Sequence, residues 1–96
     1  MDKRFNPLSP AEELHARRGL AEDLAANPDM PIPAVIRKIR GSLRLTIAEY
    51  AKVCGVSART LQDIEREVSS PTLATAEKLL RPMGMAPGAV VRPRQR

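Results

Sequence analysis

The 96-residue sequence lacks the groups that form disulfides, metal sites and membrane spans. It has one cysteine, Cys54, and one histidine, His15, which exclude an intramolecular disulfide and argue against a structural zinc site. No apolar run approaches the roughly 20 residues that cross a bilayer, and no signal-peptide-like apolar region stands at the N-terminus. These absences predict a cytoplasmic protein without a metal or another cofactor. Catalytic Ser/His/Asp sets and phosphate-binding loops are missing too, so an enzyme is not expected.

Aromatic residues are also scarce, since only Phe5 and Tyr50 are present. A surface that stacks on single-stranded bases is therefore not expected. Hydrophobic residues still make up 43% of the chain, so the core has to be built from aliphatic side chains, which suits packed helices. Cys54 falls at an apolar position, where we expect a buried, inert thiol.

Positive charge is abundant but unevenly distributed. Residues 1–32 carry four basic and six acidic groups, residues 33–68 seven and four, and residues 69–96 five and one, so the net charges are −2, +3 and +4. A basic excess in the middle and at the end of a chain is typical of a protein that binds a polyanion.

Residues 1–32 predict one helix and a stiff linker. Ser9 and Glu12 have the spacing of a capping box, and a helix is expected from about Pro10 to Ala26. Its apolar face is predicted to consist of Leu14, Ala21, Leu24 and Ala25, with Leu20 at the edge. Three prolines within residues 27–33 indicate the linker.

Residues 33–85 have the periodicity of further short helices. Pro33 is expected to open the first of them. Thr46 begins a second capping box, Gly55 interrupts the pattern, and Ser57 and Thr72 can each cap another helix. The residues predicted to face inward are Val35, Ile36, Ile39, Leu43, Leu61, Ile64, Leu73, Ala76, Leu79 and Leu80.

The stretch from Thr46 to Glu65 has the spacing of a helix-turn-helix. Ala51 is small enough for two helices to cross closely, and Gly55 supplies the positive φ of a tight turn. With these and the flanking positions in register from Ile36 to Met85, the chain resembles the Cro/cI-type (lambda-repressor-like, XRE) family. The resemblance implies an all-α, five-helix DNA-binding domain at 33–85, with an extra N-terminal helix in 1–32 and a short strand or basic tail in 86–96.

The resemblance also implies a recognition helix from Ala58 to about Glu65 that enters the major groove. Arg59 can hold guanine with two hydrogen bonds, Gln62 can do the same for adenine, and Ala58 can rest on a thymine methyl. Asp63 is the fourth outward residue, and it can accept from cytosine or orient Arg59. The alternative to base reading is that these four residues only form a solvated polar face of the helix.

Phosphate contacts are expected from two helix N-termini and a set of polar and basic residues. This set is Thr46, Ser57, Thr60, Arg37, Arg40, Arg44 and Arg66. Family resemblance also pairs Arg40 with Glu65, as a structural ion pair that can additionally touch phosphate. The sequence departs from the family at Ile47, where glutamine is common, and at Glu67, where glycine is common.

These features leave three hypotheses about partners. The first is a homodimeric repressor that binds a palindromic operator in double-stranded DNA. The second is an antitoxin that binds a protein toxin and represses its own operon. The 9–26 helix could cover one face of the domain, swap onto a partner subunit or bind another protein, and the β-prone run at Val90–Arg92 could pair with its two-fold mate as a small antiparallel ribbon. The third is a protein-interaction domain that has kept the fold without binding DNA.

Overall fold

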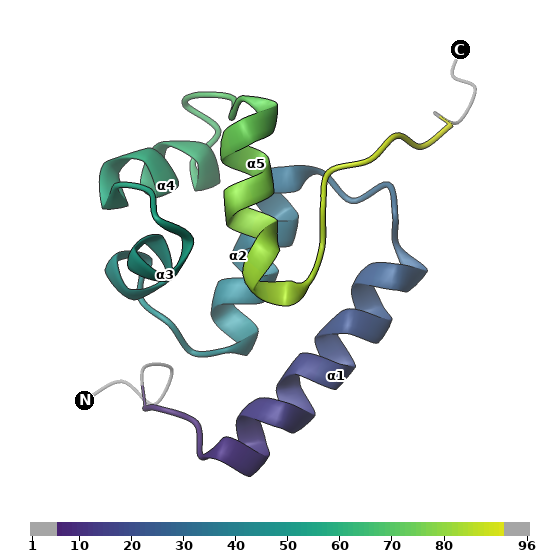
Figure 1. Cartoon of the computed structure of the whole chain (residues 1–96), viewed down its shortest axis with the longest axis vertical. Coiled ribbons are helices and arrows are strands. Elements are labelled where there is room, and N and C mark those ends of the chain that lie inside the picture. Colours follow the sequence, from purple (N-terminus) through teal and green to yellow (C-terminus); the bar gives the residue numbers. More distant parts are fainter. Residues whose placement is uncertain (1–5, 92–96) are drawn as a thin grey trace.

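A computed structural model of the chain describes residues 6–91 and has five α-helices (Figure 1). They are α1 (Pro10–Ala26), α2 (Ile32–Ser42), α3 (Ile47–Cys54), α4 (Ala58–Glu65) and α5 (Leu73–Leu80), followed by the 3-10 turn η2 (Arg81–Met83). Residues 6–91 contain no strand, so the all-α prediction is confirmed. Of the possible C-terminal strand, Val90 and Val91 lie in irregular chain, and Arg92 with the rest of the basic tail lies outside the described residues.

Both predicted capping boxes are present. The Ser9 hydroxyl accepts from the Glu12 amide at 3.2 Å, and the Glu12 carboxylate accepts from the Ser9 amide at 2.9 Å. Thr46 and Glu49 make the same pair of bonds at 3.1 and 2.8 Å. Each box satisfies donors that an isolated helix start leaves without partners, which fixes where α1 and α3 begin. α2 begins one residue before Pro33.

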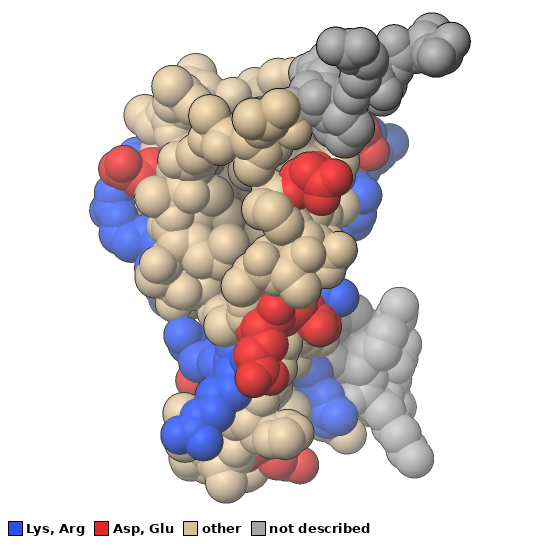
Figure 2. All heavy atoms as spheres, turned by 90° about the vertical axis from the view of Figure 1, so that its right-hand side faces the viewer, with Lys and Arg blue, Asp and Glu red and all other residues tan. Residues whose placement is uncertain are grey.

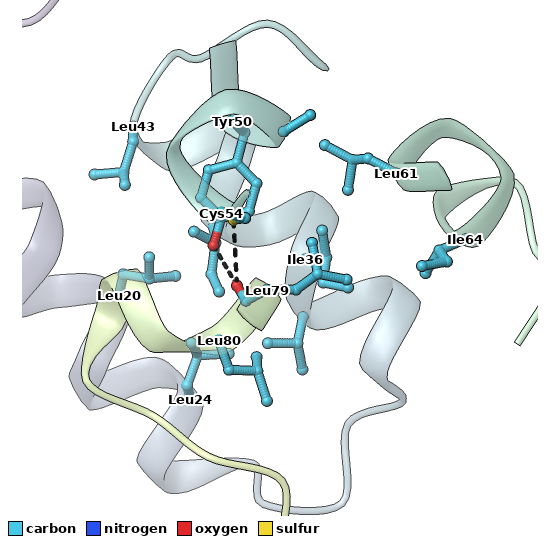
Figure 3. Close-up of a cluster of buried hydrophobic side chains, with 13 residues drawn as sticks. Leu20, Leu24, Ile36, Leu43, Tyr50, Cys54, Leu61, Ile64, Leu79 and Leu80 are labelled. Carbon is cyan, nitrogen blue, oxygen red and sulfur yellow. Dashed lines mark hydrogen bonds between the residues drawn. The ribbon is translucent and has the colours of Figure 1, made fainter. Parts of the chain in front are cut away.

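The core lies where α2, α3, α4 and α5 meet. Tyr50, Ile36, Leu61 and Leu79 are each fully buried there (Figure 3). Ile39 is fully buried as well. The Tyr50 hydroxyl donates to the Leu79 carbonyl oxygen at 2.5 Å, which satisfies the polar end of this aromatic side chain. That bond ties α3 to α5 beneath the turn that leads into α4.

α1 covers one side of this core with a face that differs from the predicted one. Leu20 and Leu24 are buried, whereas Leu14 is 54% exposed and Ala21 and Ala25 are exposed. The predicted apolar face of α1 was therefore wrong at three of its positions. The apolar residues of α1 are spread around the helix, so its own periodicity did not select a face, and packing against α2 and α5 did.

Two polar contacts fix α1 against the rest of the chain. The Arg17 guanidinium donates to the Pro82 carbonyl oxygen at 3.0 Å, and Asp23 lies 3.5 Å from the Lys38 ammonium on α2. Of the roles that the sequence left open for this helix, the structure shows it covering a face of its own chain.

The predicted inner face of α5 is also wrong at one position. Ala76, Leu79 and Leu80 are buried, but Leu73 is 79% exposed. Leu73 is the first residue of α5, and the buried face of this helix begins one turn later.

Candidate nucleic-acid interface

The turn between α3 and α4 depends on Gly55. This residue has φ +78° and caps α3, donating to the Ala51 carbonyl oxygen at 2.9 Å. A Cβ at this position would meet no atom within 4 Å, so the requirement for glycine is conformational and not steric. Ala51, at 2% exposure, is buried under the same turn.

The inner face of α4 is fixed by burial. Leu61 and Ile64 are at most 1% exposed, and Glu65 is 6% exposed. An eight-residue helix is not stable by itself in water, so these contacts are what hold α4 helical. Because the inner face is fixed, the direction of the outer face is fixed as well.

The outer face of α4 carries the residues that the sequence assigned to base reading. Ala58, Arg59 and Gln62 are exposed, and the Arg59 side chain is 82% exposed. Asp63 differs from them, because its side chain is only 29% exposed. Its carboxylate lies 3.4 Å from the Arg59 guanidinium, one helical turn away, so Asp63 holds Arg59 along the helix surface.

Arg40 and Glu65 form a bidentate ion pair between α2 and the end of α4. Arg40 donates from Nε and Nη2 to the two carboxylate oxygens at 2.8 and 2.9 Å, and from Nη1 to the Leu45 carbonyl oxygen at 3.1 Å. The hydrogen bonds with Glu65 raise the pKa of Arg40. These bonds use three of the five guanidinium N–H groups, so the same side chain can still donate to a phosphate.

Arg37 supports the same end of α4. It donates to the Glu65 carbonyl oxygen, and its guanidinium lies 3.9 Å from the Glu67 carboxylate. A cation at a helix C-terminus stabilises the carbonyl groups that have no partner within the helix. A role for Arg37 in phosphate binding would therefore compete with these contacts.

Glu67 stands in the left-handed region with φ +60°. Residues with a Cβ rarely adopt this conformation, and the cost is roughly 1–2 kcal/mol. The family's common glycine at this position has a physical reason, because the chain reverses here after α4. Arg44 also has a positive φ, +55°, which sequence reasoning missed because no glycine marks the position.

The N-termini of α3 and α4 offer different electrostatics to a phosphate. The Ser57 hydroxyl accepts from the Thr60 amide at 3.0 Å and bonds the Thr60 hydroxyl at 2.8 Å, and the first turn of α4 holds no acidic residue. The first turn of α3 holds Glu49, which bonds back to Thr46. The start of α4 is therefore the better anion site of the two.

The remaining predicted residues are placed around this surface. Arg66 is exposed at the end of α4, and Arg44 is exposed before α3. Ile47, the other departure from the family, is partly buried and packs against the core. A glutamine there would have a polar end to satisfy, and isoleucine contributes apolar contact instead.

Other kinds of site find no support in residues 6–91. That part of the chain has no cluster of three His, Cys, Asp or Glu side chains that could hold a metal ion. None of its helices is long and apolar enough to cross a membrane. Cys54 is free and buried, and burial raises the pKa of its thiol, so the nucleophilic thiolate form is disfavoured.

Comparison with known proteins agrees with this geometry. The family model described as helix-turn-helix matches residues 36–89, which is more than half of the chain and includes α3, α4 and the turn between them. No curated protein and no solved structure matches the chain. The match covers the Arg40–Glu65 pair and every residue that the sequence assigned to DNA contact. The chain therefore belongs to the XRE-type, Cro/cI-like helix-turn-helix family and is a DNA-binding regulator.

Proposed function

We propose that the protein is a sequence-specific repressor that places α4 in the major groove of a palindromic operator and binds it as a dimer. The observation that carries this proposal is the outer face of α4. Its inner face is fixed by Leu61, Ile64 and Glu65, while Arg59 and Gln62 remain exposed on the other side. A side chain that reads bases has to reach the groove from a helix whose orientation is fixed.

In this proposal Arg59 reads guanine and Gln62 reads adenine, each with two hydrogen bonds, and Ala58 contacts a thymine methyl. Asp63 positions Arg59, because its carboxylate lies 3.4 Å from the guanidinium and its side chain is partly buried. A bidentate contact needs its donors in one plane and at one angle, and a neighbouring carboxylate restricts the rotamers that Arg59 can adopt.

Phosphates on either side of the groove would be held by two groups of residues. The first lies at the start of α4, where Ser57 and Thr60 surround a helix N-terminus without an acidic neighbour. The second consists of Arg44 before α3 and Arg66 after α4, with Thr46, Arg37 and Arg40 contributing to the extent that their contacts within the protein allow. Such contacts set the register of the protein on DNA and do not select a sequence.

Selection of bound duplexes from a random pool tests this function. The expected result is a palindromic consensus with half-site centres about 34 Å apart, one helical turn. A consensus without symmetry would contradict dimeric binding. Negligible, salt-independent binding to every duplex would contradict the function and would favour a protein-interaction domain, with Ile47 and Glu67 as the residues that weaken DNA contact.

Arg59 can then be tested against a matched arginine. Arg59→Ala should weaken binding to the selected duplex by about 1–3 kcal/mol and relax one base position. Arg81→Ala is the control, because Arg81 also forms an exposed i,i+4 ion pair, with Glu77 at 3.0 Å. This variant removes the same charge from the residue that directly follows α5. Equal losses in the two variants would mean that α4 contributes only charge.

An antitoxin is the second candidate, and a groove behind the core favours it. Figure 1 shows α4 on the left and the irregular segment after α5 on the right. Residues 27–32, 85–88 and 90 line a groove of about 250 Å³. Leu24, Val35 and Leu80 lie at its base. The upper half of the face turned to the viewer in Figure 2 is largely uncharged. Co-expression with the product of the neighbouring gene should give a stable complex if this candidate is right.

A further inference from the structure

Another hollow, of about 340 Å³, lies between α1, α3 and the end of α5. The residues that line it are Arg17, Val53, Cys54, Lys78, Arg81 and Pro82. Three of the six are cations, and each comes from a different element: Arg17 from α1, Lys78 from α5 and Arg81 from η2. Within residues 6–91, no acidic side chain lines this space. We call it the cationic hollow.

The carboxylates that pair with these cations do not line the hollow. Glu13 lies 3.4 Å from Arg17, one helical turn away on α1. Glu77 lies 3.0 Å from Arg81, again one turn away, and both glutamates are more than half exposed. Lys78 forms no ion pair within the part of the chain that the structure describes. Exposed pairs contribute little free energy, so an anion in the hollow can join three cations without displacing a strong pair.

Arg17 is oriented at the hollow by the main chain. Its Nη1 donates to the Pro82 carbonyl oxygen at 3.0 Å, and Pro82 itself lines the hollow. A guanidinium has five N–H groups in a fixed plane, so others remain to bind a carboxylate or a phosphate. A ligand would therefore meet an arginine that is already ordered, which lowers the entropy cost of binding.

The side chains that α3 contributes to the hollow are apolar. Val53 is 61% exposed, whereas Cys54 is buried beside Tyr50, and both Cys54 and Tyr50 point to the Leu79 carbonyl oxygen (Figure 3). This wall is thus part of the contact between α3 and α5. A bare inorganic anion would leave Val53 in water, whereas an apolar group attached to the anion would cover it. The volume is at the lower end of the range for small-molecule sites, roughly 300–1,000 Å³.

We propose that the cationic hollow binds a small organic anion, in which a phosphate or carboxylate group contacts the three cations and an apolar group covers Val53. The site is separate from DNA recognition, because no residue of α4 lines it, and Figure 1 shows α4 at the upper left and α1 at the lower right. It joins α1, which lies outside the matched segment 36–89, to α3 and α5, which lie inside it. A bound ligand would therefore hold the N-terminal extension against the helix-turn-helix.

Calorimetric titration of the full chain, without DNA, tests the site. Phenyl phosphate and benzoate carry the two anionic groups on the same ring, phenol is the neutral control, and inorganic phosphate lacks the apolar group. Phenyl phosphate should bind with a Kd of about 0.1–1 mM, as suits a ligand of its size, and should raise the Tm because it binds only the folded state. Benzoate should bind more weakly, since a phosphate monoester carries about 1.5–2 negative charges and a carboxylate carries one. Phenol and inorganic phosphate should bind more weakly than phenyl phosphate.

Substitution of the cations locates the bound anion. Lys78→Gln and Arg81→Gln should each weaken phenyl phosphate binding by about fivefold, the scale of an exposed ion pair. Lys52→Gln and Arg18→Gln are the matched controls, because these exposed cations lie on α3 and α1 but do not line the hollow. Both controls should keep the wild-type affinity. All four side chains are exposed, so the variants are expected to fold.

Val53→Ala separates the apolar contact from the charge. It should weaken binding of phenyl phosphate by about threefold, because part of the apolar area that the ring covers is lost. Binding of inorganic phosphate, measured by competition, should not change. Equal effects on the two ligands, or no effect on either, would overturn the apolar part of the proposal.

Two further results would overturn the site itself. One is the absence of heat and of any change in Tm at millimolar phenyl phosphate. The other is an equal loss of affinity in the lining variants and in their controls, which would mean that the anion responds only to net charge. None of these measurements involves DNA, so this site and the proposed function can fail independently of each other.

Discussion

α1 and α4 are held in the fold in opposite ways. α1 has 17 residues and buries two of them, Leu20 and Leu24, whereas α4 has eight residues and buries three, Leu61, Ile64 and Glu65. The longer helix has enough local hydrogen bonds and a capping box to define it, and the shorter one is defined by what it packs against. The comparison shows that the proposed DNA-reading helix depends on packing against the rest of the fold.

This contrast also separates the family part of the chain from its extension. α4 lies inside the matched segment 36–89, and α1 lies outside it. Changes in α4's inner face should therefore alter stability and DNA binding together. Changes in α1 should alter stability alone.

The largest expected effect comes from truncating the inner face of α4. Leu61→Ala should lower the free energy of unfolding by about 3–5 kcal/mol, because the side chain is fully buried on the face of α4 that packs against α2 and α3. Leu24→Ala on α1 is the matched variant, since Leu24 is 4% exposed, and about 2–3 kcal/mol is expected because a peripheral helix can relax into the space. Urea denaturation measures both. A larger loss from Leu24→Ala would reverse the comparison.

The next effect concerns the ion pair at the end of α4. Glu65→Gln leaves the Arg40 guanidinium partly buried without its carboxylate and should cost about 1–3 kcal/mol, reduced from a fully buried pair because the Arg40 side chain is 22% exposed. Glu77→Gln removes an exposed pair with Arg81 and should cost at most about 0.5 kcal/mol. Thermal unfolding of the two variants shows whether the stability of an ion pair in this protein depends on its burial. Equal losses would mean that the Arg40–Glu65 pair behaves like a surface pair.

A smaller loss of stability is expected at alkaline pH, through Tyr50 and Cys54 on α3. Burial raises the pKa of both Tyr50 and Cys54, and the neighbouring Cys54 raises that of Tyr50 further. For groups whose pKa is higher in the folded state, stability is complete below the unfolded-state pKa and declines above it. The decline should begin near pH 8.5 and steepen above about pH 10, by roughly 1.4 kcal/mol per pH unit for each group.

Tyr50→Phe tests the origin of this alkaline decline. The variant loses the hydrogen bond to the Leu79 carbonyl oxygen and so some stability at pH 7, but its stability should fall less steeply above pH 10. Melting curves between pH 7 and 11 compare the slopes. An unchanged slope would mean that Tyr50 ionises equally well in both states. α1 acts in the opposite direction, because the charge of Arg17 lowers the pKa of Tyr50.

The smallest effect should appear only in α1. Gly19 is exposed in the middle of this helix, and a Cβ there would meet no atom within 4 Å. Gly19→Ala should therefore raise the free energy of unfolding by about 0.5–1 kcal/mol through helix propensity alone. Chemical denaturation resolves a change of this size. No gain would show that α1 is also limited by packing, and the contrast with α4 would be weaker.

Sequence reasoning recovered the helix boundaries because their signals are local. The Ser9–Glu12 and Thr46–Glu49 boxes act across three residues, and Gly55 alone sets the left-handed turn. The inward residues of α2 and α4 were also predicted correctly, because their apolar residues occupy one side of a regular helix. In these segments the apolar face that the sequence pattern predicts is the face that is buried.

The same reasoning failed where a pattern allowed more than one face. Nothing in the order of residues in α1 distinguishes Leu14, which is exposed, from Leu20, which is buried. The bond from Arg17 to Pro82 joins residues 65 positions apart and has no local signal. For the site, the resemblance led to a proposal of base-reading residues on α4, but no signal in the sequence indicated the contact of Arg37 with the end of α4.

The sequence by itself determined where the helices begin and end, how the turn before α4 is made, and which residue types α4 carries. Caps, left-handed glycines and periodicity act within a few residues, and those effects do not depend on the rest of the fold. The tertiary structure decided which side of α1 is buried and which way α4 faces. Those choices depend on side chains from other helices, such as Arg40 from α2 on Glu65 and Leu79 from α5 beneath Tyr50.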